Sequence, residues 1–490
     1  MTAPSPFTIS DIEKAIGSKP VVKSCDKKQL FYNIGTNSRS IGKNDLFLAL
    51  KGERFDGADF VPELIDAGIR GFIVPRGFLN HLPEKKKKDL KSKNNEISLF
   101  ETSNSLTALG LLANFQRMRS RAKIIAITGS SGKTTTREMI GKILEPCFNT
   151  LCTKGNLNNE IGLPLTLLGL GMDHEMAVVE MGMNHPGEIS RLGKIALPDI
   201  AVITNTSKAH LEGLGTVDNI ALAKAEIFRF MNKNSTAIIN IHDAKFKVLK
   251  AKAEENNNIN EIICFGTHEK ADIKACRISY DNTGTKFSIL GKNQISSNIV
   301  LNSPAPFMVK NALAACAASL KAGADGDSIK KGLQTFTPVK GRMSLAEFSD
   351  TINLIDDTYN ANPDSVKQAL ITLSIVAEKN RSIAVLGDML ELGKDAENLH
   401  QETGRFAAER KISRLYTFGK LGAHIVKGAV KAGLPEKYTM NGTKKEIAEK
   451  VMNQGSTCVS WVLVKGSRGM EMEKVIHEMQ KLKTDGRKGK

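Results

Sequence analysis

Residues 129–134, with the sequence GSSGKT, have the residue types of a phosphate-binding loop. The glycines let backbone N–H groups turn toward phosphate oxygens, and a helix beginning near Lys133 would point its positive end at them. Lys133 would pair with the β- and γ-phosphates of a nucleotide, and the Thr134 hydroxyl would reach Mg²⁺. The spacing is shorter than the common GxxxxGKS or GxxxxGKT. However, an apolar stretch precedes the loop and apolar residues at helical spacing follow it, which favours an ATP site over an ordinary turn.

Four further side chains could work with this loop. Glu180 offers the carboxylate oxygens that Mg²⁺ prefers. Histidine is an unusual Mg²⁺ ligand, so residue type alone favours a buried structural role for His210. Lys224 lies in a helical stretch, where a solvated lysine is the usual interpretation. Arg342 follows a glycine at a domain junction, where it could reach a phosphate across a cleft or serve only the structure.

The elements that must position these residues repeat one pattern, in which an apolar stretch of strand length ends and a polar residue follows. Such stretches span residues 124–127, 176–179, 200–203 and 237–239, and they are followed by Thr128, Glu180, Thr204 and Asn240. Helical patterns separate them, which predicts a largely parallel sheet flanked by helices. Because ligands of such sheets bind at the carboxyl ends of the strands, Glu180 and His210 are expected beside the loop.

The chain length of 490 residues predicts about three domains and an α/β fold class. We expect a small mixed α/β domain at residues 1–105, a central domain with a P-loop-type, mostly parallel sheet and flanking helices at 106–340, and a Rossmann-like α/β domain at 341–490. The last two domains would face each other across a cleft that could close over ATP.

The composition is that of a globular protein, with 41% hydrophobic and 25% charged residues and no run of eighteen apolar residues. Seven scattered cysteines form no CxxC pair, which argues against disulfides and zinc and for a reducing compartment. No basic segment followed by an apolar one opens the chain. We therefore expect a cytoplasmic protein that does not associate with membranes.

The net charge of +17 raises the alternative of a nucleic-acid-binding or nucleotide-switch ATPase, which would bind polynucleotides in a salt-sensitive way. Six lysines crowd into residues 85–93 and further basic residues into the tail, and such runs are usually solvated loops or frayed ends. Aromatic residues are scarce at 5%, and we find no RNA-binding motif. We therefore expect small anionic substrates and no nucleic acid.

Long motifs in a fixed order make nearly the whole chain resemble the ATP-dependent Mur ligases of peptidoglycan synthesis. They are TGSSGKTTT (128–136), GNLNNEIGLPLTLL (155–168), VVEMGMNHPGEI (178–189), ITNTSKAHLEGLG (203–215), AKAEIF (223–228), GRM (341–343), IDDTYNANPDS (355–365), GDMLELG (387–393) and VKGSR (464–468). The stretches DDTYNANPDS and GNLNNEIG resemble the member that adds a dipeptide, and the DNPR motif of the diaminopimelate-adding type is absent.

The resemblance implies an enzyme that holds a UDP-sugar peptide in its N-terminal domain, ATP in the middle one and an incoming dipeptide in the C-terminal one. The implied reaction joins D-alanyl-D-alanine to UDP-MurNAc-tripeptide through an acyl phosphate, with ATP and Mg²⁺, as the last cytoplasmic step of peptidoglycan precursor synthesis. We expect a monomer acting on these small molecules. Another ATP-dependent amide ligase, such as a folylpolyglutamate synthase, is the alternative that the central motifs alone leave open. Whether the third peptide residue is diaminopimelate or lysine stays open as well.

The resemblance also implies roles by position. The ATP-binding residues would be Gly129, Ser130, Ser131, Gly132, Lys133, Thr134, Thr135, Asn240, Arg342 and Asp357. Thr134 matches a Mg²⁺ ligand, and Glu180 and His210 match ligands of a second Mg²⁺, which reverses the interpretation of His210. Lys224 matches a lysine that is carbamylated in these ligases, and it completes a catalytic set with Lys133, Glu180 and His210.

The implied substrate-binding residues are Tyr359, Asn360 and Asn362 for the dipeptide side, Asn158 and Asn159 for the muramoyl substrate, and Ser38 and Arg39 for the uridine nucleotide. The chain departs from the family pattern at three places. Asn37 replaces the acid of a TDSR motif, residues 240–243 read NIHD in place of NADD, and Phe307-Met308 replaces a His-Asn pair, so contacts to adenine are not assumed there.

Overall fold

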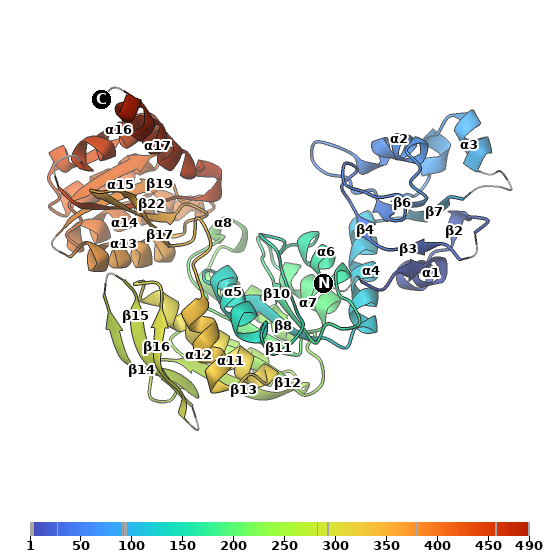
Figure 1. Ribbon diagram of the computed structural model, residues 1–490, viewed down its shortest axis with the longest axis horizontal. Helices are drawn as coiled ribbons and strands as arrows, with labels where there is room; N and C mark the ends of the chain where they lie inside the picture. Colours follow the sequence, from blue (N-terminus) through green and yellow to red (C-terminus); the bar gives the residue numbers. More distant parts are fainter. Residues whose placement is uncertain are drawn as a thin grey trace.

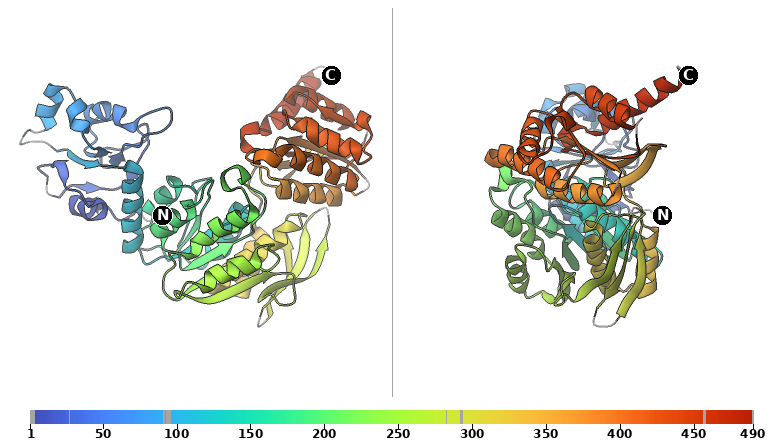
Figure 2. Two further views of the ribbon diagram at one scale, coloured as in Figure 1. Left: turned by 180° about the vertical axis from the view of Figure 1, so that it is seen from behind. Right: turned by 90° about the vertical axis from the view of Figure 1, so that its left-hand side faces the viewer.

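The computed structural model describes residues 4–488 except 27, 91, 93–95, 282, 292–293, 379 and 456–457. Its strands form sheets in three units that follow one another along the chain (Figure 1). The N-terminal and C-terminal units rise on opposite sides of the middle unit (Figure 2). The expected α/β fold class is confirmed. Within the described ranges, no helix combines the length and the apolar character needed to cross a bilayer.

The N-terminal unit is built on a mixed sheet with the strand order β2-β7-β6-β5-β4. Its strands are β2 (Pro20–Val22), β4 (Ile34–Gly35), β5 (Leu46–Leu48), β6 (Gly71–Pro75) and β7 (Ser98–Thr102), and β1 (Phe7–Thr8) pairs separately with β3 (Leu30–Phe31). Strands β4 to β7 run parallel, and β2 is antiparallel to β7. Helices α1 (Ile9–Ile16), α2 (Val61–Asp66) and α3 (Glu84–Leu90) complete the unit.

Helix α3 corrects the expectation of a solvated lysine loop at residues 85–93. Leu90 is buried at the end of this helix, and Lys86 pairs with Asp66 of α2 at 2.8 Å. One apolar anchor and one ion pair therefore hold the first four lysines in a helix against the unit. Lys91 and Lys93 lie outside the described residues.

The middle unit contains a sheet with the order β16-β15-β14-β13-β12-β11-β8-β10-β9. The strands are β8 (Lys123–Thr128), β9 (Thr150–Cys152), β10 (Met176–Glu180), β11 (Ile200–Ile203), β12 (Ser235–Asn240), β13 (Ile259–Gly266), β14 (Ile273–Tyr280), β15 (Thr285–Leu290) and β16 (Gln294–Leu301). Pairing is parallel from β9 through β14, and antiparallel between β14, β15 and β16.

Helices cover both faces of this sheet, which explains why its central strands carry buried apolar residues on both faces. They are α4 (Ser105–Arg119), α5 (Lys133–Leu144), α6 (Gly162–Leu168), α7 (Glu188–Ala196), α8 (Leu211–Leu214), α9 (Val217–Ala225), α10 (Phe246–Glu254), α11 (Phe307–Ala322) and α12 (Gly326–Thr335). Alternate residues of β8 point to opposite faces. Ile125 and Ile127 belong to the core shared with α5 and α11, and Ile124 belongs to the core shared with α4 and α7.

The C-terminal unit has the strand order β17-β18-β22-β19-β20-β21, parallel except for the edge strand β17. Its strands are β17 (Ser344–Ser349), β18 (Ile352–Asp357), β19 (Arg381–Gly387), β20 (Arg414–Phe418), β21 (Thr439–Asn441) and β22 (Ser460–Lys465), with helices α13 (Pro363–Ala377), α14 (Ala396–Glu409), α15 (Gly422–Lys431), α16 (Lys444–Gly455) and α17 (Glu473–Lys488). The carboxyl ends of β18, β19 and β22 approach the middle unit, where one buried apolar cluster continues from α11 to α13.

Candidate functional site

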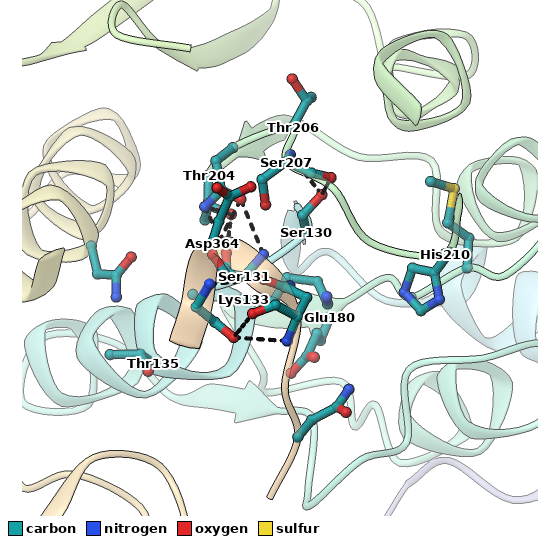
Figure 3. Close-up of a pocket in the computed structure, with 18 of the residues that line it drawn as sticks. Ser130, Ser131, Lys133, Thr135, Glu180, Thr204, Thr206, Ser207, His210 and Asp364 are labelled. Atoms are coloured by element: carbon teal, nitrogen blue, oxygen red, sulfur yellow. Dashed lines mark hydrogen bonds between the residues drawn. The ribbon is translucent and has the colours of Figure 1, made fainter. Parts of the chain in front are cut away.

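A cavity of about 940 Å³ lies between the carboxyl ends of β8, β10, β11 and β12 and the beginning of the C-terminal unit (Figure 3). Most of the residues singled out in the sequence line it: Ser130, Ser131, Gly132, Lys133, Thr135, Asn158, Asn159, Glu180, His210, Asn240, Arg342, Asp357, Tyr359, Asn360 and Asn362. The structure therefore brings side chains from both units to one cavity. Gly129, Thr134 and Lys224 lie outside the lining set, as do Ser38 and Arg39 of the N-terminal unit.

The glycine-rich loop connects β8 to α5, as expected. Gly132 stands before the first residue of the helix with φ +80°, and a Cβ there would lie 2.4 Å from Asn311 Oδ1. Both the backbone conformation and the close approach therefore require glycine. The N-terminus of α5, a helix of 12 residues, faces the cavity, an arrangement that fits a phosphate group, while the amides of Ser130 and Ser131 donate to Asn205.

The end of β11 holds the loop in shape. Thr204 Oγ1 donates a hydrogen bond to Ser131 O at 2.6 Å, and Asn205 Nδ2 donates to the same oxygen at 3.0 Å. Asn205 Oδ1 accepts a bond from Ser131 N at 3.1 Å. The polar residues at this strand end were recognised in the sequence, but their role as a clamp on the loop was not. Their position could have indicated this role, because they follow β11, which pairs in parallel with β8, the strand that precedes the loop.

Lys133 is a half-buried cation at the end of the loop. Its ammonium donates to Gly129 O at 2.7 Å. Burial lowers the pKa of Lys133, an effect that the Glu180 carboxylate opposes and the Arg342 guanidinium reinforces. Figure 3 shows Ser131, Lys133 and Glu180 close together at the beginning of α5. The site therefore offers a cation and a carboxylate beside the phosphate-binding amides.

Glu180 is almost fully buried and is contacted by three donor side chains, two from α5 and one from the loop before α6. Thr134 Oγ1 donates to Oε2 at 2.9 Å, and Asn158 Nδ2 donates to Oε1 at 2.9 Å. Arg137 Nη1 lies 3.4 Å from Oε2, and it also donates to Gly155 O at 3.0 Å. The hydroxyl of Thr134 and the carboxylate of Glu180 are oxygen ligands of the kind that Mg²⁺ takes, so the residues present fit this ion.

Sequence reasoning missed Arg137. It lies four residues after Lys133, on the helix face that the apolar residues Ile140 and Leu144 identify as buried, and it is only 2% exposed. A charged residue on an apolar helix face was the signal that could have found it, because such a residue needs a buried partner.

His210 has a protein partner that the sequence did not indicate. It has φ +56°, immediately before α8, and its Nδ1 lies 2.6 Å from Oε2 of Glu391 in the C-terminal unit. In Figure 3, His210 stands on a segment separate from the one that carries Glu180. In the described part of the chain, no three His, Cys, Asp or Glu side chains are grouped closely enough to hold a metal ion. The role of His210 as a Mg²⁺ ligand therefore stays a prediction.

Lys224 is buried, so the interpretation as a solvated lysine is wrong. Its side chain is 2% exposed, near the end of α9, and among the described residues it has neither a hydrogen-bond acceptor nor an ion-pair partner. Burial, together with the charge of Lys133, holds the pKa of Lys224 well below its usual value, and Asp243 opposes this shift only in part. A buried amine in its neutral form is a nucleophile.

The C-terminal unit contributes further charged groups to the cavity. The Arg342 guanidinium lies 3.9 Å from the centre of the Tyr359 ring. Asp357, at the end of β18, pairs with Lys465 at the end of β22 at 2.6 Å, and Lys465 Nζ donates to Asn360 O at 2.7 Å. Lys465 had no assigned role in the sequence, although it follows an apolar strand in the same way as the other site residues.

Several predicted binding residues also shape the backbone. Asn362 caps α13 by accepting from Ser365 N at 2.8 Å, and Asn240 Nδ2 donates to Thr204 O at 3.1 Å. Phe307 lines the cavity at the start of α11, where the sequence departs from the family pattern. These side chains therefore fix the walls of the cavity, whatever else they contact.

Ser38 and Arg39 lie in the loop after β4. Arg39 N donates to Asn37 Oδ1 at 3.1 Å, so the asparagine that replaces the family's acid supports the turn. The structure does not bring this loop into the cavity, and its contact with a uridine nucleotide stays a prediction.

Comparison with known proteins agrees with this arrangement. Residues 127–319 match the Mur ligase middle domain, residues 341–468 match the Mur ligase glutamate ligase domain, and residues 30–116 match the Mur ligase family catalytic domain. The chain is 34% identical to the UDP-N-acetylmuramoyl-tripeptide–D-alanyl-D-alanine ligase of Bacillus subtilis over 92% of its length and 94% of that protein.

Two solved structures share the fold. MurF from Acinetobacter baumannii is 31% identical with a TM-score of 0.86, and the match covers 98% of this chain and all of that one. MurF ligase from Thermotoga maritima in complex with ADP is 27% identical with a TM-score of 0.77, covering 92% of this chain and 97% of that one. The chain therefore belongs to the Mur ligase family, and it is an ATP-dependent ligase that forms amide bonds.

Proposed function

We propose that the chain joins D-alanyl-D-alanine to UDP-MurNAc-tripeptide, with conversion of ATP to ADP and phosphate. The observation that carries this proposal is the shared cavity, in which the phosphate-binding loop of the middle unit faces Tyr359, Asn360 and Asn362 of the C-terminal unit. The relatives that match over nearly the whole chain are named for this reaction. This reaction would be the last cytoplasmic step of peptidoglycan precursor synthesis.

The chemistry requires activation of a carboxylate, because its leaving group would otherwise be oxide. A carboxylate oxygen of the tripeptide attacks the γ-phosphorus of ATP, the bond to the β-phosphate oxygen breaks, and ADP leaves. The amine of the dipeptide then attacks the acyl phosphate, loses a proton, and expels inorganic phosphate as the amide forms. The protein contributes mainly positioning and neutralisation of charge.

The residues of the cavity suit both tasks. The N-terminus of α5 and Lys133 would hold the transferred phosphate, and Arg342 would approach it from the C-terminal unit. Thr134 and Glu180, with His210, would hold Mg²⁺, which neutralises phosphate charge when it is bound. The predicted contacts of Ser130, Ser131, Thr135, Asn240 and Asp357 with the nucleotide belong to the same proposal.

Lys224 is proposed to act as a carbamate. Its buried amine has a pKa held well below the usual value, and a neutral amine is the form that combines with carbon dioxide. The product is an anion and would remove the repulsion between Lys224 and Lys133. Burial of an unpaired lysine beside a second lysine is the observation that favours this modification.

The remaining parts of the proposal concern organisation and location. We place the domain boundaries at 1–105, 106–340 and 341–490, supported by sheets whose strands each fall within one range. We propose a cytoplasmic monomer without membrane association. The cysteines, all of which are unpaired, support a reducing compartment. The cavity is lined by two units of one chain, which supports a monomer.

The test is phosphate release by the purified protein with ATP, Mg²⁺ and UDP-MurNAc-tripeptide. We expect release to depend on D-alanyl-D-alanine, and single amino acids such as D-alanine to support little of it. Tripeptides ending in diaminopimelate or lysine identify the preferred third residue. Phosphate release that is indifferent to the dipeptide would refute the assignment.

A further inference from the structure

Glu391 connects the C-terminal unit to a residue of the proposed Mg²⁺ site. Its Oε2 lies 2.6 Å from Nδ1 of His210, and its backbone oxygen accepts a hydrogen bond from Glu212 N at 3.1 Å. Glu391 comes from the loop after β19, whereas His210 and Glu212 flank the start of α8 in the middle unit. Both Glu391 and His210 hold positive φ angles, +62° and +56°. Glu391 thus makes two contacts between the C-terminal unit and the middle unit, one through its side chain and one through its backbone.

The loop that carries Glu391 is fixed within its own unit. His400 Nε2 accepts a hydrogen bond from Met389 N at 2.9 Å, and Ser467 Oγ accepts one from Leu390 N at 2.8 Å. His400 is fully buried, and its Nδ1 lies 2.6 Å from Ala396 O, which fixes the ring. Glu391 is therefore presented by a rigid support and moves with the C-terminal unit.

Stability does not explain this contact. The Glu391 side chain is 53% exposed, and a carboxylate–imidazole contact so open to water contributes about 0–1 kcal/mol. The positive φ angles of two residues other than glycine carry a cost of similar size. Because the contact gains little stability and lies at the edge of the cavity, we infer that it serves the chemistry of His210.

A carboxylate on Nδ1 has a definite consequence for an imidazole. It keeps the proton of the neutral ring on Nδ1, so Nε2 carries the free lone pair, and it fixes the plane of the ring. Histidines that bind metal ions usually have such a partner on the other nitrogen, and loss of the partner costs about 10–100-fold in metal affinity or activity. Glu391 gives His210 this partner from another unit of the fold.

We propose that Glu391 is a positioning residue that orients His210 for Mg²⁺, so that this part of the site is complete only when the C-terminal unit is docked. The inference rests on the proposed Mg²⁺ site. The unit that brings the dipeptide would thereby also prepare the site that activates the carboxylate. Docking would then couple the use of ATP to the presence of the acceptor.

The variants Glu391→Gln and Glu391→Ala test this role. The chain offers a matched control in Glu397, whose carboxylate lies 3.8 Å from His424 Nδ1 in the same unit and outside the lining of the cavity. Glu397→Gln removes a carboxylate–histidine contact without touching His210. Affinity for ADP is measured by calorimetry with and without Mg²⁺, and the ring nitrogens of His210 are followed by ¹⁵N NMR, assigned with His210→Gln.

We expect the wild type and Glu397→Gln to hold the His210 proton on Nδ1 and to bind ADP more tightly with Mg²⁺. In Glu391→Ala, His210 should be a mixture of the two neutral tautomers, with the proton on Nδ1 or on Nε2. The increase in ADP affinity that Mg²⁺ causes should fall about 10-fold or more, while the ADP affinity without Mg²⁺ should not change. Glu391→Gln should lie between them. A Glu391→Ala protein with the wild-type ring form and Mg²⁺ effect would overturn the inference. A wild type without any Mg²⁺ effect would instead refute the proposed site itself.

Discussion

The substitution Arg137→Met tests the account of how Glu180 is held. Arg137 and Glu180 are 2% and 1% exposed, and the guanidinium Nη1 lies 3.4 Å from the carboxylate Oε2. Methionine keeps the apolar part of the side chain but removes the charged guanidinium group. It leaves Glu180 as a buried anion with Thr134 and Asn158 as its neutral donors.

The expected loss of stability is about 3–5 kcal/mol, the usual cost of leaving one member of a buried ion pair without its partner. Coulomb's law at this separation, with an effective dielectric constant of about 20, also gives about 5 kcal/mol. The two neutral donors that Glu180 retains place the expectation near the lower end, at about 3 kcal/mol. Little discount for solvent applies, because both side chains are buried.

Hydrogen–deuterium exchange by mass spectrometry is the suitable assay, since a protein of three units does not unfold in one step. Amides of β8 and β10 report the local free energy of opening around Glu180. Two comparisons sharpen the result. Arg117→Met, which breaks a pair with the partly exposed Asp199 at 3.2 Å, should cost less. The double variant Arg137→Met/Glu180→Met should be more stable than Arg137→Met alone, because it no longer buries an unpaired charge. A loss below about 1 kcal/mol in Arg137→Met, or no recovery in the double variant, would refute the reasoning.

Three further outcomes are expected. Gly132→Ala should lower the affinity for ADP about 10-fold or more, because the added Cβ would lie 2.4 Å from Asn311 Oδ1. Gly17→Ala is the control, because Gly17 also has a positive φ but has open space around its Cβ position, and it should leave the affinity unchanged. Calorimetry with ADP measures both variants. Lys224→Ala should lose activity that a short-chain carboxylic acid partly restores, and a fully active variant would remove Lys224 from the site. Burial lowers the pKa of His400 below its usual 6.5, so the unfolded chain binds a proton that the folded one does not, and stability should fall as pH drops below 6.5. Urea unfolding followed by tryptophan fluorescence should show the free energy of unfolding falling by at most about 1.4 kcal/mol per pH unit. The fall should be smaller in His400→Gln.

The sequence allowed prediction of those parts of the site that depend on local order along the chain. Apolar strands ending in Thr204 and Asn240 lie side by side in the sheet because parallel strands bring their carboxyl ends to one edge. The glycine at position 132 was recognisable because only its backbone freedom suits the turn. Such features depend on only a few adjacent residues, so the local sequence is enough to predict them.

Features that depend on pairing across the fold were not predictable in the same way. Glu391 meets His210 across 181 positions of sequence, and nothing near either residue indicates the other. Lys224 was misread because its helix has no clear apolar face, so local periodicity could not reveal that the lysine is buried. Helix α3 forms where a charged loop was expected, and one buried leucine and two ion pairs offset the repulsion among its lysines.

The central claim is that ATP phosphorylates the carboxylate of the tripeptide before the dipeptide amine attacks it. The most direct measurement uses UDP-MurNAc-tripeptide with ¹⁸O in the reacting carboxylate, together with ATP, Mg²⁺ and D-alanyl-D-alanine. Mass spectrometry follows the label. If the carboxylate oxygen attacks phosphorus, one ¹⁸O atom should appear in each released phosphate and the other in the new amide. Phosphate without ¹⁸O, released while the amide product forms, would contradict the account.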